Sequence, residues 1–570
     1  MLVPLRKIKK RDVLFVLCLL AVLLISRWKV TKGFGNIDES FFLTVPQRLL
    51  QGDGLLVDEW NLAQTFGVLL VPLMALYKAV FPNNEGIILV FRYFYIAVQA
   101  AFSIYIYLCL RDRKWSVLAV LPFMIFVPHN IMALSYNSMG VQCLTASLAT
   151  MNSSKLSGPW MFISGLFFAA SVLCCPFLAV LYPVYILVAV GMRKRTGEQQ
   201  VYALSGRAFW AFTGGCALLA VITLAMILQN SIGDIIAAIP QILNDYRHEP
   251  SSLWNNISTY GAAVLDSNST SRFAMAAYAL LLVWWAVDMK AFKSVCRDII
   301  FAASLLVSGV YLAGFFRGLV FINFYMFPLA CTGLFAFVTD KEKDWKLFGL
   351  FWLPAMLYTF LIHCGSNQEF YVISSAAAVA SVPSILLMGR RFKSIENVGG
   401  IHVRGLGIAL VLAVCTGLTI SRVRDTFWDE SVGELDHWIG RGANAGVWTT
   451  GERHQVYETL YDDTQLIRQQ KGKVLYYSRD TYLYLMDDKE MAAYSAWLAI
   501  DYENNSEWQR LLSYYRLNPE KLPDCIYLSK VINISPEQIL ADLGAQGEIT
   551  ENIYGYSIII NWDRSPDSTD

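Results

Sequence analysis

Acidic residues gather soon after the first apolar stretch of the chain. Five carboxylates fall within 22 residues, and Arg48 is the only cation among them. The five are Asp38, Glu39, Asp53, Asp58 and Glu59. A carboxylate about 3 Å from a hydroxyl can accept its proton while the hydroxyl oxygen attacks an electrophilic carbon. Carboxylate oxygens also bind hard cations. The segment therefore predicts general-base chemistry, and Mg²⁺ or Mn²⁺ is the cofactor that it could hold.

Apolar residues at helical spacing follow the first two carboxylates. They are Phe41, Phe42, Val45, Leu49 and Leu50. This spacing predicts an amphipathic helix along the membrane interface, capped by Asp38, with the carboxylates facing outward at the membrane surface. The alternative is an ordinary helix cap on a solvated surface, because Asp is a common cap.

The composition places this segment in a membrane protein. Of the 570 residues, 55% are hydrophobic and 16% are charged, whereas soluble domains carry about 25% charged residues. A net charge of +1 argues against a nucleic-acid partner. The eleven cysteines show no metal-binding spacing, and we expect buried free thiols.

Long apolar runs predict about thirteen transmembrane helices. Lys and Arg clusters mark cytoplasmic loops, and one topology places five basic clusters inside. The run at 65–81, interrupted by Pro72, is then predicted to lie in or re-enter the interface. The N-terminus is cytoplasmic and the C-terminus extracytoplasmic. The predicted spans are 12–28, 86–110, 115–128, 138–152, 158–174, 176–192, 208–228, 273–289, 298–315, 319–338, 347–363, 369–388 and 403–420.

The last 150 residues have the composition of a soluble domain. Residues 473–477, 525–528 and 556–560 are rich in β-formers and predict strands. Residues 506–516 predict a helix, and Ser535 before Pro536 predicts another helix start. We therefore expect two domains. They are a transmembrane domain over 1–420, with its first external loop at 29–85, and an extracytoplasmic α/β domain over 421–570.

The first loop resembles the GT-C glycosyltransferases. The residues that carry the resemblance are Asp38-Glu39, Gly52-Asp53, Asp58-Glu59, Leu70-Val71-Pro72-Leu73 and Arg92. The most similar groups are the protein O-mannosyltransferases and the lipid A aminoarabinose transferases. The motif match covers only residues 36–92. Val71-Pro72-Leu73 stands where the aminoarabinose group has Lys-Pro-Pro-Leu, which leaves donor and acceptor open.

The resemblance implies a GT-C-like fold and an enzyme of the cell envelope. It implies a polyprenyl-phosphate-linked sugar donor and Asp38 as the catalytic base. Glu39 orients the base or the acceptor, and Asp58 is a second acidic position. We expect inverting hexosyl or pentosyl transfer to a hydroxyl of a glycan, lipid or protein, among membrane lipids.

Other polar residues at the predicted outer face are candidates for substrate binding. Arg92 could pair with the donor phosphate or with a carboxylate of the first loop, and snorkelling to the interface is the ordinary alternative. Turn chemistry also explains several of the others. The predicted substrate-binding residues are Glu59, Arg92, His129, Asn130, Tyr136, Asn137, Arg317, Ser366 and Asn367. The segment 229–272 is predicted to be a long external loop and a candidate lid.

Two other classes of protein compete with the transferase. A transporter or lipid flippase usually has charges in mid-membrane and inverted repeats, and neither is evident here. A receptor or scaffold would explain the C-terminal residues but not the acidic first loop. The sequence therefore favours the glycosyltransferase.

Overall fold

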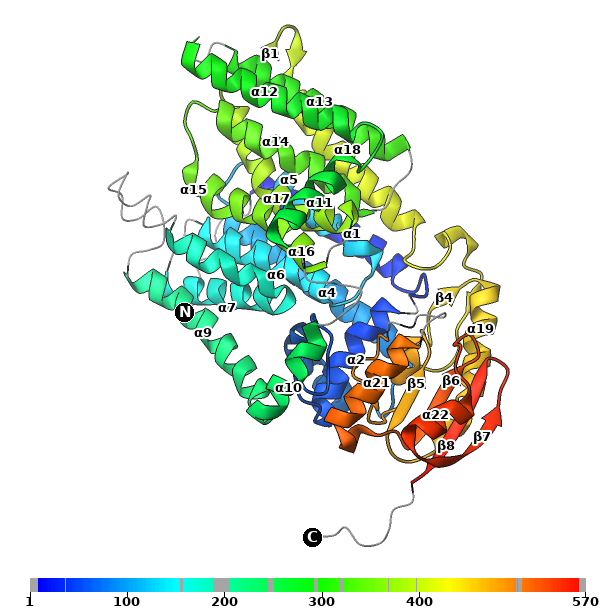
Figure 1. Ribbon diagram of the computed structural model, residues 1–570. Coiled ribbons are helices and arrows are strands. Elements are labelled where there is room, and N and C mark those ends of the chain that lie inside the picture. The colour runs from blue at the N-terminus through cyan, green and yellow to red at the C-terminus, as the bar shows by residue number, and fades with distance from the viewer. Residues whose placement is uncertain are drawn as a thin grey trace. The chain divides into compact units, whose positions relative to one another are not determined.

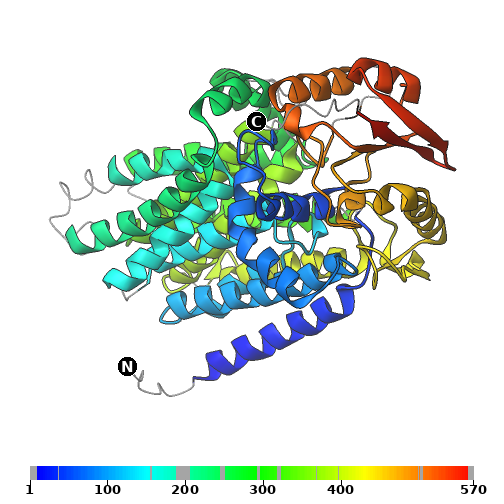
Figure 2. The same cartoon turned by 90° about the horizontal axis from the view of Figure 1, so that it is seen from below.

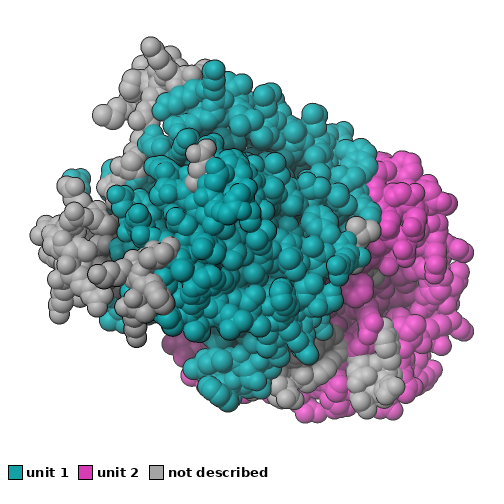
Figure 3. Space-filling model, turned by 90° about the horizontal axis from the view of Figure 1, so that it is seen from above, with its two compact units in different colours: residues 1–29, 94–221, 250–425 teal, residues 30–93, 222–249, 426–570 magenta. Residues whose placement is uncertain are grey.

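The computed structural model describes residues 9–35, 37–153, 157–187, 206–243, 251–291, 296–317, 322–366, 369–395, 397–498, 500 and 505–562. The chain is mostly helical (Figure 1). It divides into two compact units, each assembled from three segments (Figure 3). Unit 1 comprises residues 1–29, 94–221 and 250–425, and unit 2 comprises residues 30–93, 222–249 and 426–570.

Unit 1 is built from helices, many of which run alongside one another (Figure 2). Helix α4 begins in unit 2 and helix α9 ends there. The described elements of this part are α1 (Lys10–Lys29), α4 (Ile87–Leu110), α5 (Ser116–Ile125), η2 (Pro128–Asn130), α6 (Tyr136–Met151), α7 (Gly158–Cys174), η3 (Pro176–Val180), α9 (Gly206–Ile227), α11 (Leu253–Leu265), α12 (Ser271–Ala291), α13 (Arg297–Arg317), η4 (Ile322–Tyr325), α14 (Met326–Thr339), α15 (Trp345–Leu347), η5 (Phe348–Trp352), α16 (Leu353–Ser366), α17 (Phe370–Arg391), β1 (Asn397–Val398), β2 (Ile401–His402) and α18 (Val403–Arg424).

Eight helical stretches in the described residues are long and apolar enough to cross a membrane. They are Ile87–Leu110, Gly206–Ile227, Ser271–Met289, Arg297–Arg317, Ile322–Thr339, Trp345–Ser366, Phe370–Arg391 and Val403–Arg424. The chain is therefore an integral membrane protein. The predicted spans at 115–128, 138–152 and 158–174 fall on helices of 10, 16 and 17 residues. Residues 188–192 lie outside the described residues. The count of thirteen spans and the orientation of the termini stay predictions.

Helix α17 forms the centre of unit 1. It contacts α14, α16 and α5, and nearly all of its residues are buried. Ser and Ala occupy every position over 374–381 except Val379, and these small residues let the neighbouring helices approach closely. Gly333 on α14 shows how close the approach is, because an added Cβ would lie 2.3 Å from the Ser384 hydroxyl oxygen.

Unit 2 combines helices with a small sheet. The sheet has the order β5-β6-β8-β7, with β5 parallel to β6 and the other pairs antiparallel. The elements of this unit are α2 (Asp38–Gln51), η1 (Gln64–Phe66), α3 (Gly67–Val80), α10 (Ile232–Leu243), η6 (Val432–Glu434), β3 (His437–Trp438), β4 (Trp448–Thr449), α19 (Gly451–Asp463), α20 (Gln465–Gln469), β5 (Val474–Tyr477), η7 (Thr481–Leu485), α21 (Ser506–Leu517), η8 (Pro519–Lys521), β6 (Cys525–Ser529), α22 (Pro536–Leu543), β7 (Gln546–Glu551) and β8 (Gly555–Asn561).

The predicted elements of the C-terminal residues are confirmed. Strands β5, β6 and β8 and helix α21 match the predicted segments to within one residue at each end. Ser535 caps α22 by accepting a hydrogen bond from the Gln538 backbone N–H, and Pro536 is the first helical residue. The C-terminal residues do not form unit 2 alone, however, because the first loop and residues 222–249 belong to the same unit.

The segment 229–272 was predicted to be a long external loop between two spans, and its external position stays a prediction. It contains α10 and α11, with residues 244–250 outside the described residues. Both helices carry enough apolar residues to pack: Ala238 and Ile242 are buried on α10, and Val264 is buried on α11. Its predicted role as a lid is untested.

Candidate functional site

Helix α2 carries the first of the acidic residues into the interior of unit 2. Residues 39–48 of this helix are all buried. Its polar side is covered by C-terminal residues: the Ser40 hydroxyl lies 2.5 Å from that of Thr481, and the Gln47 amide donates to the Tyr484 carbonyl at 3.4 Å. The predicted interfacial helix with outward-facing carboxylates is therefore wrong. Hydrophobic spacing locates the apolar side of a helix, but it says nothing of what covers the polar side.

The ends of α2 also differ from the prediction. Ile37 is the residue before the first turn, and no side chain caps this end. Asp38 is the first residue of the helix rather than its cap. At the other end Gly52 adopts φ +102°, and its N–H donates to the Arg48 carbonyl. The left-handed conformation at this position suits glycine.

Glu39 and Arg92 form a buried ion pair. The guanidinium of Arg92 donates to both carboxylate oxygens of Glu39, each at 2.6 Å. It also donates to the backbone carbonyls of Val30 at 2.9 Å and Gly33 at 2.8 Å. Arg92 is 5% exposed and Glu39 is 3% exposed. The donor phosphate and a carboxylate of the first loop were the two partners predicted for Arg92. Its contacts in the structure are with a carboxylate of the first loop, that of Glu39. The pair joins the start of α4 to α2 and to residues 30–33.

Asp38 has a different environment from its neighbour Glu39. It is half-buried, and within the described residues no cation forms an ion pair with it. Burial raises the pKa of Asp38 to about 6, and a hydrogen bond from the Trp428 side chain opposes that rise. The two adjacent carboxylates thus have different surroundings, because Glu39 is paired with Arg92 and, within the described residues, Asp38 is paired with no cation.

Trp428 is held in place beside Asp38 by a short turn. Its φ of +57° is uncommon for a bulky residue. The Asp429 carboxylate anchors the turn, accepting from the Phe34 N–H at 2.7 Å and from the Thr449 hydroxyl at 2.8 Å. Strained backbone that is fixed by its surroundings is often found at functional sites.

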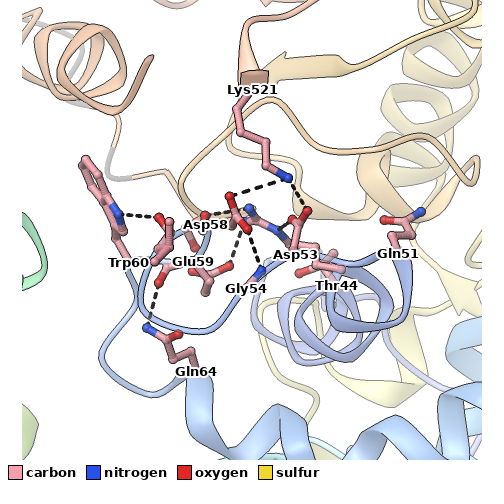
Figure 4. A network of polar contacts seen from close by, with 12 residues as sticks. Thr44, Gln51, Asp53, Gly54, Asp58, Glu59, Trp60, Gln64 and Lys521 are labelled. Atoms are coloured by element: carbon pink, nitrogen blue, oxygen red, sulfur yellow. Dashed lines mark hydrogen bonds and ion pairs between the residues drawn. The ribbon is translucent and has the colours of Figure 1, made fainter. Parts of the chain in front are cut away.

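The other three carboxylates belong to a buried network with two cations (Figure 4). Arg48 donates to Asp53 at 2.6 Å, to Glu59 at 2.9 Å and to the Asp58 carbonyl at 2.7 Å. Lys521 reaches the same network from the C-terminal residues, with its Nζ 2.5 Å from Asp53 and 3.6 Å from Asp58. The network therefore ties the first loop to the C-terminal part of unit 2.

The surroundings shift the pKa values of the three network carboxylates in different directions. Burial alone would raise the pKa of Asp53, but the charges of Arg48 and Lys521 hold it below its usual range. Burial raises the pKa of Asp58, and the negative charge of Asp53 adds to this effect. Burial also raises the pKa of Glu59, against the attraction of Arg48.

The network leaves few carboxylate oxygens of the first loop available as ligands of a metal ion. Asp53 and Glu59 already bind Arg48, and Asp58 accepts the Gly54 backbone N–H at 2.5 Å. Among the described residues, no three His, Cys, Asp or Glu side chains are grouped as metal ligands. These carboxylates therefore form ion pairs and backbone contacts, where the sequence left a divalent cation open as an alternative.

His129 and Asn130 lie in unit 1 as a buried pair. Both have positive φ, at +57° and +62°. The His129 N–H donates to the Asn323 side-chain oxygen at 2.7 Å, and burial lowers the pKa of His129 to about 4. The Asn130 amide donates to the carbonyls of Ser421 and Asp425, at 3.1 and 2.7 Å. These contacts tie the turn after α5 to η4 and to the end of α18.

The remaining predicted substrate-binding residues also belong to unit 1. Tyr136 and Asn137 are half-buried in the first turn of α6, which the Ser135–Ser138 capping box begins. Arg317 is exposed at the end of α13. Ser366 ends α16, and its hydroxyl donates to the Ile362 carbonyl at 3.0 Å. Asn367 lies outside the described residues. Their roles in binding stay predictions.

Two residues that contact the acidic loop carry no signal in the sequence. Trp428 and Lys521 are separated from Asp38 and Asp53 by about four hundred residues or more of chain. No local pattern pairs residues over such a distance. Arg48 was visible as the only cation of the segment, and its charge among five carboxylates was the available clue to a buried network.

Comparisons with known proteins found similarity only to solved structures. No protein-family model and no curated protein matches the chain. An oligosaccharyltransferase, AglB, from the archaeon Archaeoglobus fulgidus, in complex with an inhibitory peptide and a dolichol-phosphate, matches with 11% identity and a TM-score of 0.45. The match covers 91% of this chain and 70% of that chain. A second structure from the same organism, tethered with an acceptor peptide, matches with 11% identity and a TM-score of 0.42, over 96% and 74% of the two chains.

Proposed function

We propose that the protein is a membrane glycosyltransferase that moves a sugar from a polyprenyl-phosphate donor to an acceptor hydroxyl on the outer face of the membrane. The carrying observation is the state of Asp38. It is the carboxyl group of the first loop that is half-buried, lacks an ion-pair partner among the described residues and has a pKa of about 6. A general base works best when its pKa lies near the operating pH.

The proposed reaction is an inverting substitution at the anomeric carbon. The acceptor oxygen forms a bond to that carbon as the bond from carbon to the phosphate oxygen breaks. Asp38 takes the hydroxyl proton, and the lipid phosphate leaves with the electron pair of the broken bond. In-line attack with a single base inverts the configuration. A glycan, a lipid or a protein could supply the acceptor hydroxyl, and a hexose or a pentose could be transferred.

Glu39 and Arg92 serve Asp38 as positioning residues in this proposal. Their bidentate pair fixes the first turn of α2, on which Asp38 stands. Bidentate pairing of a carboxylate with a planar guanidinium fixes the relative orientation of the two groups. The network around Asp58 and Glu59 supports the proposal in a different way, because it fixes the part of the first loop that follows α2. The predicted roles of Asp58 in catalysis and of Glu59 in substrate binding remain proposals.

The central test compares Asp38→Asn with a matched control. The assay follows consumption of polyprenyl-phosphate-linked hexoses and pentoses by purified full-length protein in lipid nanodiscs. We expect Asp38→Asn to lower kcat by about 10²–10⁴, because a general base contributes about that factor. Asp488→Asn removes an exposed carboxylate of the same unit and should leave kcat within about twofold.

The pH profile adds a second readout. Turnover should rise as the pH increases through about 6, because Asp38 must lose its proton to act as a base. If Asp38→Asn kept turnover within a few-fold of the wild type, Asp38 could not be the base. If the sugar lipid crossed vesicle membranes without being consumed, the transporter or flippase would replace the transferase.

A further inference from the structure

Arg422 of unit 1 is a buried cation without a carboxylate partner in the described part of the chain. It lies in the last turn of α18 and is 2% exposed. Its guanidinium donates to the Ile125 carbonyl at 3.0 Å and to the Ser26 hydroxyl at 2.7 Å. Its Nε–H is buried and has no hydrogen-bond partner among the described residues. A buried charge is costly unless it is paired.

The acidic residue nearest to Arg422 in the sequence has other partners. Asp425, one turn away in sequence, pairs with Arg424 and accepts from the Ser421 hydroxyl. Lys29 is also buried here and donates to the Asp425 carbonyl at 2.7 Å. The Asp425 carboxylate is therefore engaged by other groups, whereas Arg422 donates to a backbone carbonyl and a hydroxyl, both of which are neutral. An anion from outside the chain would compensate the charge of Arg422.

A small hollow beside Arg422 offers room for such an anion. It measures about 260 Å³ with its mouth, and its free interior of about 10 Å³ fits one oxygen atom. Ser26, Tyr95 and Arg422 are among the polar residues that line it. Tyr95 is 1% exposed, and its hydroxyl has no partner among the described residues. Two unsatisfied buried groups, one cationic and one a hydroxyl, thus belong to residues that line one hollow.

Apart from Gln99 and Ser103, the rest of the lining is apolar and suits a lipid chain. Leu19 and Leu23 of α1 and Ile96 of α4 line the hollow. The outer side of α1 exposes Leu17, Leu20 and Leu24 by 58%, 51% and 72%. In an integral membrane protein, such a side is covered by lipid. The ligand that reaches this hollow therefore combines an anionic group with a hydrocarbon chain.

We propose that Arg422, Tyr95 and Ser26 form a binding site for the phosphate group of a membrane lipid. A phosphoryl oxygen enters the hollow and accepts hydrogen bonds from the Arg422 Nε–H and the Tyr95 hydroxyl. The hydrocarbon chain lies along the apolar residues of α1 and α4. The site requires neither glycosyl transfer nor a role for Asp38, because only binding is claimed.

The test measures lipid binding by native mass spectrometry of full-length protein released from detergent. The probes are a polyprenyl monophosphate, phosphatidylglycerol, an uncharged diacylglycerol and inorganic phosphate. We expect both phosphate lipids to bind at least about tenfold tighter than the diacylglycerol, because the phosphate contributes charge-assisted hydrogen bonds. We expect no comparable binding of inorganic phosphate.

Two variants and one control assign the binding to these residues. Arg422→Gln should weaken phosphate-lipid binding by about 10–100-fold, and Tyr95→Phe by about 3–10-fold. Arg424→Gln removes a more exposed cation two residues away and should leave it within about twofold. If Arg422→Gln does not fold, Tyr95→Phe carries the test, because it removes only the hydroxyl.

Several results would overturn the proposal. Equal binding of phosphate lipids by the wild type and by Tyr95→Phe would mean that the hollow holds water only. Equal binding of inorganic phosphate and phosphate lipid would identify a site for the free anion. Unchanged binding in Arg422→Gln would place the lipid elsewhere. None of these results bears on Asp38, whose test measures turnover.

Discussion

The two acidic clusters of the first loop look alike in sequence, but their environments differ. Asp58-Glu59 repeats the motif Asp38-Glu39 twenty residues later. In the later cluster, together with Asp53, every carboxylate accepts an N–H from a cation or from the backbone. In the earlier pair, the Nε–H and one Nη–H of Arg92 donate to the two carboxylate oxygens of Glu39. Asp38 is left with the Trp428 indole as its partner.

The difference teaches that carboxylates of one motif can serve chemistry or stability according to the cations nearby. A carboxylate bound by a buried arginine is held in place by charge-assisted hydrogen bonds, so it stabilises the fold. A half-buried carboxyl group without a cation keeps a pKa near neutrality and can exchange its proton. We therefore expect substitutions in the later cluster to affect stability and those at Asp38 to affect turnover.

The largest expected effect on stability comes from Arg48→Met. This change leaves Asp53 and Glu59 buried without their shared cation, which should cost about 3–5 kcal/mol. For a folding unit of this size, the loss corresponds to a fall in Tm of about 6–20 °C, measured by circular dichroism of the protein in detergent. The control is Arg441→Met, whose half-buried pair with Glu458 should contribute about 0–1 kcal/mol. Similar shifts in both variants would contradict a structural role for the network.

A smaller loss is expected for Lys521→Met. Asp53 keeps its contact with Arg48 in this variant, so we expect a cost of about 1–3 kcal/mol. The two substitutions should be non-additive, because both cations contact Asp53. A double-mutant cycle on Tm measures the coupling. Strict additivity would mean that the two cations act on separate parts of unit 2.

The helices and strands of the chain could be predicted from the sequence to a large extent. The predicted span at 158–174 coincides with α7, and the predicted strand at 525–528 with β6. These elements are set by local apolar runs and by β-branched and aromatic residues. No helix was predicted within the external loop 229–272, where α10 and α11 lie.

The candidate site could be predicted only in its residue types. The sequence indicated Asp38, Glu39 and Arg92, and the bidentate contact of the last two agrees with one predicted pairing. It could not indicate that α2 is buried, since the residues that cover its polar side, such as Thr481, come from the far end of the chain. Tertiary contacts between distant segments decide burial, and burial decides which carboxylate carries a shifted pKa.

The smallest effect concerns the stability of Asp38→Asn, and it tests the pKa of Asp38 without any substrate. The pKa of Asp38 is raised from 3.8 to about 6 in the folded protein. Between these values the folded state binds more protons than the unfolded state, so stability falls as the pH rises from about 4 to 6. Asparagine does not titrate, and at pH 7 the variant should be more stable than the wild type by about 1 kcal/mol.

The measurement compares the Tm of Asp38→Asn and wild type from pH 4 to pH 8. The difference should be small at pH 4, grow through pH 6 and then stay constant, while Asp488→Asn should show no such trend. A difference that shrank as the pH rose would mean that the carboxylate form of Asp38 is stabilised by the fold. Asp38 would then resemble Asp53, and the contrast between the two acidic clusters would disappear. Loss of turnover with a gain in stability, in contrast, is the combination that a base held in an unfavourable environment produces.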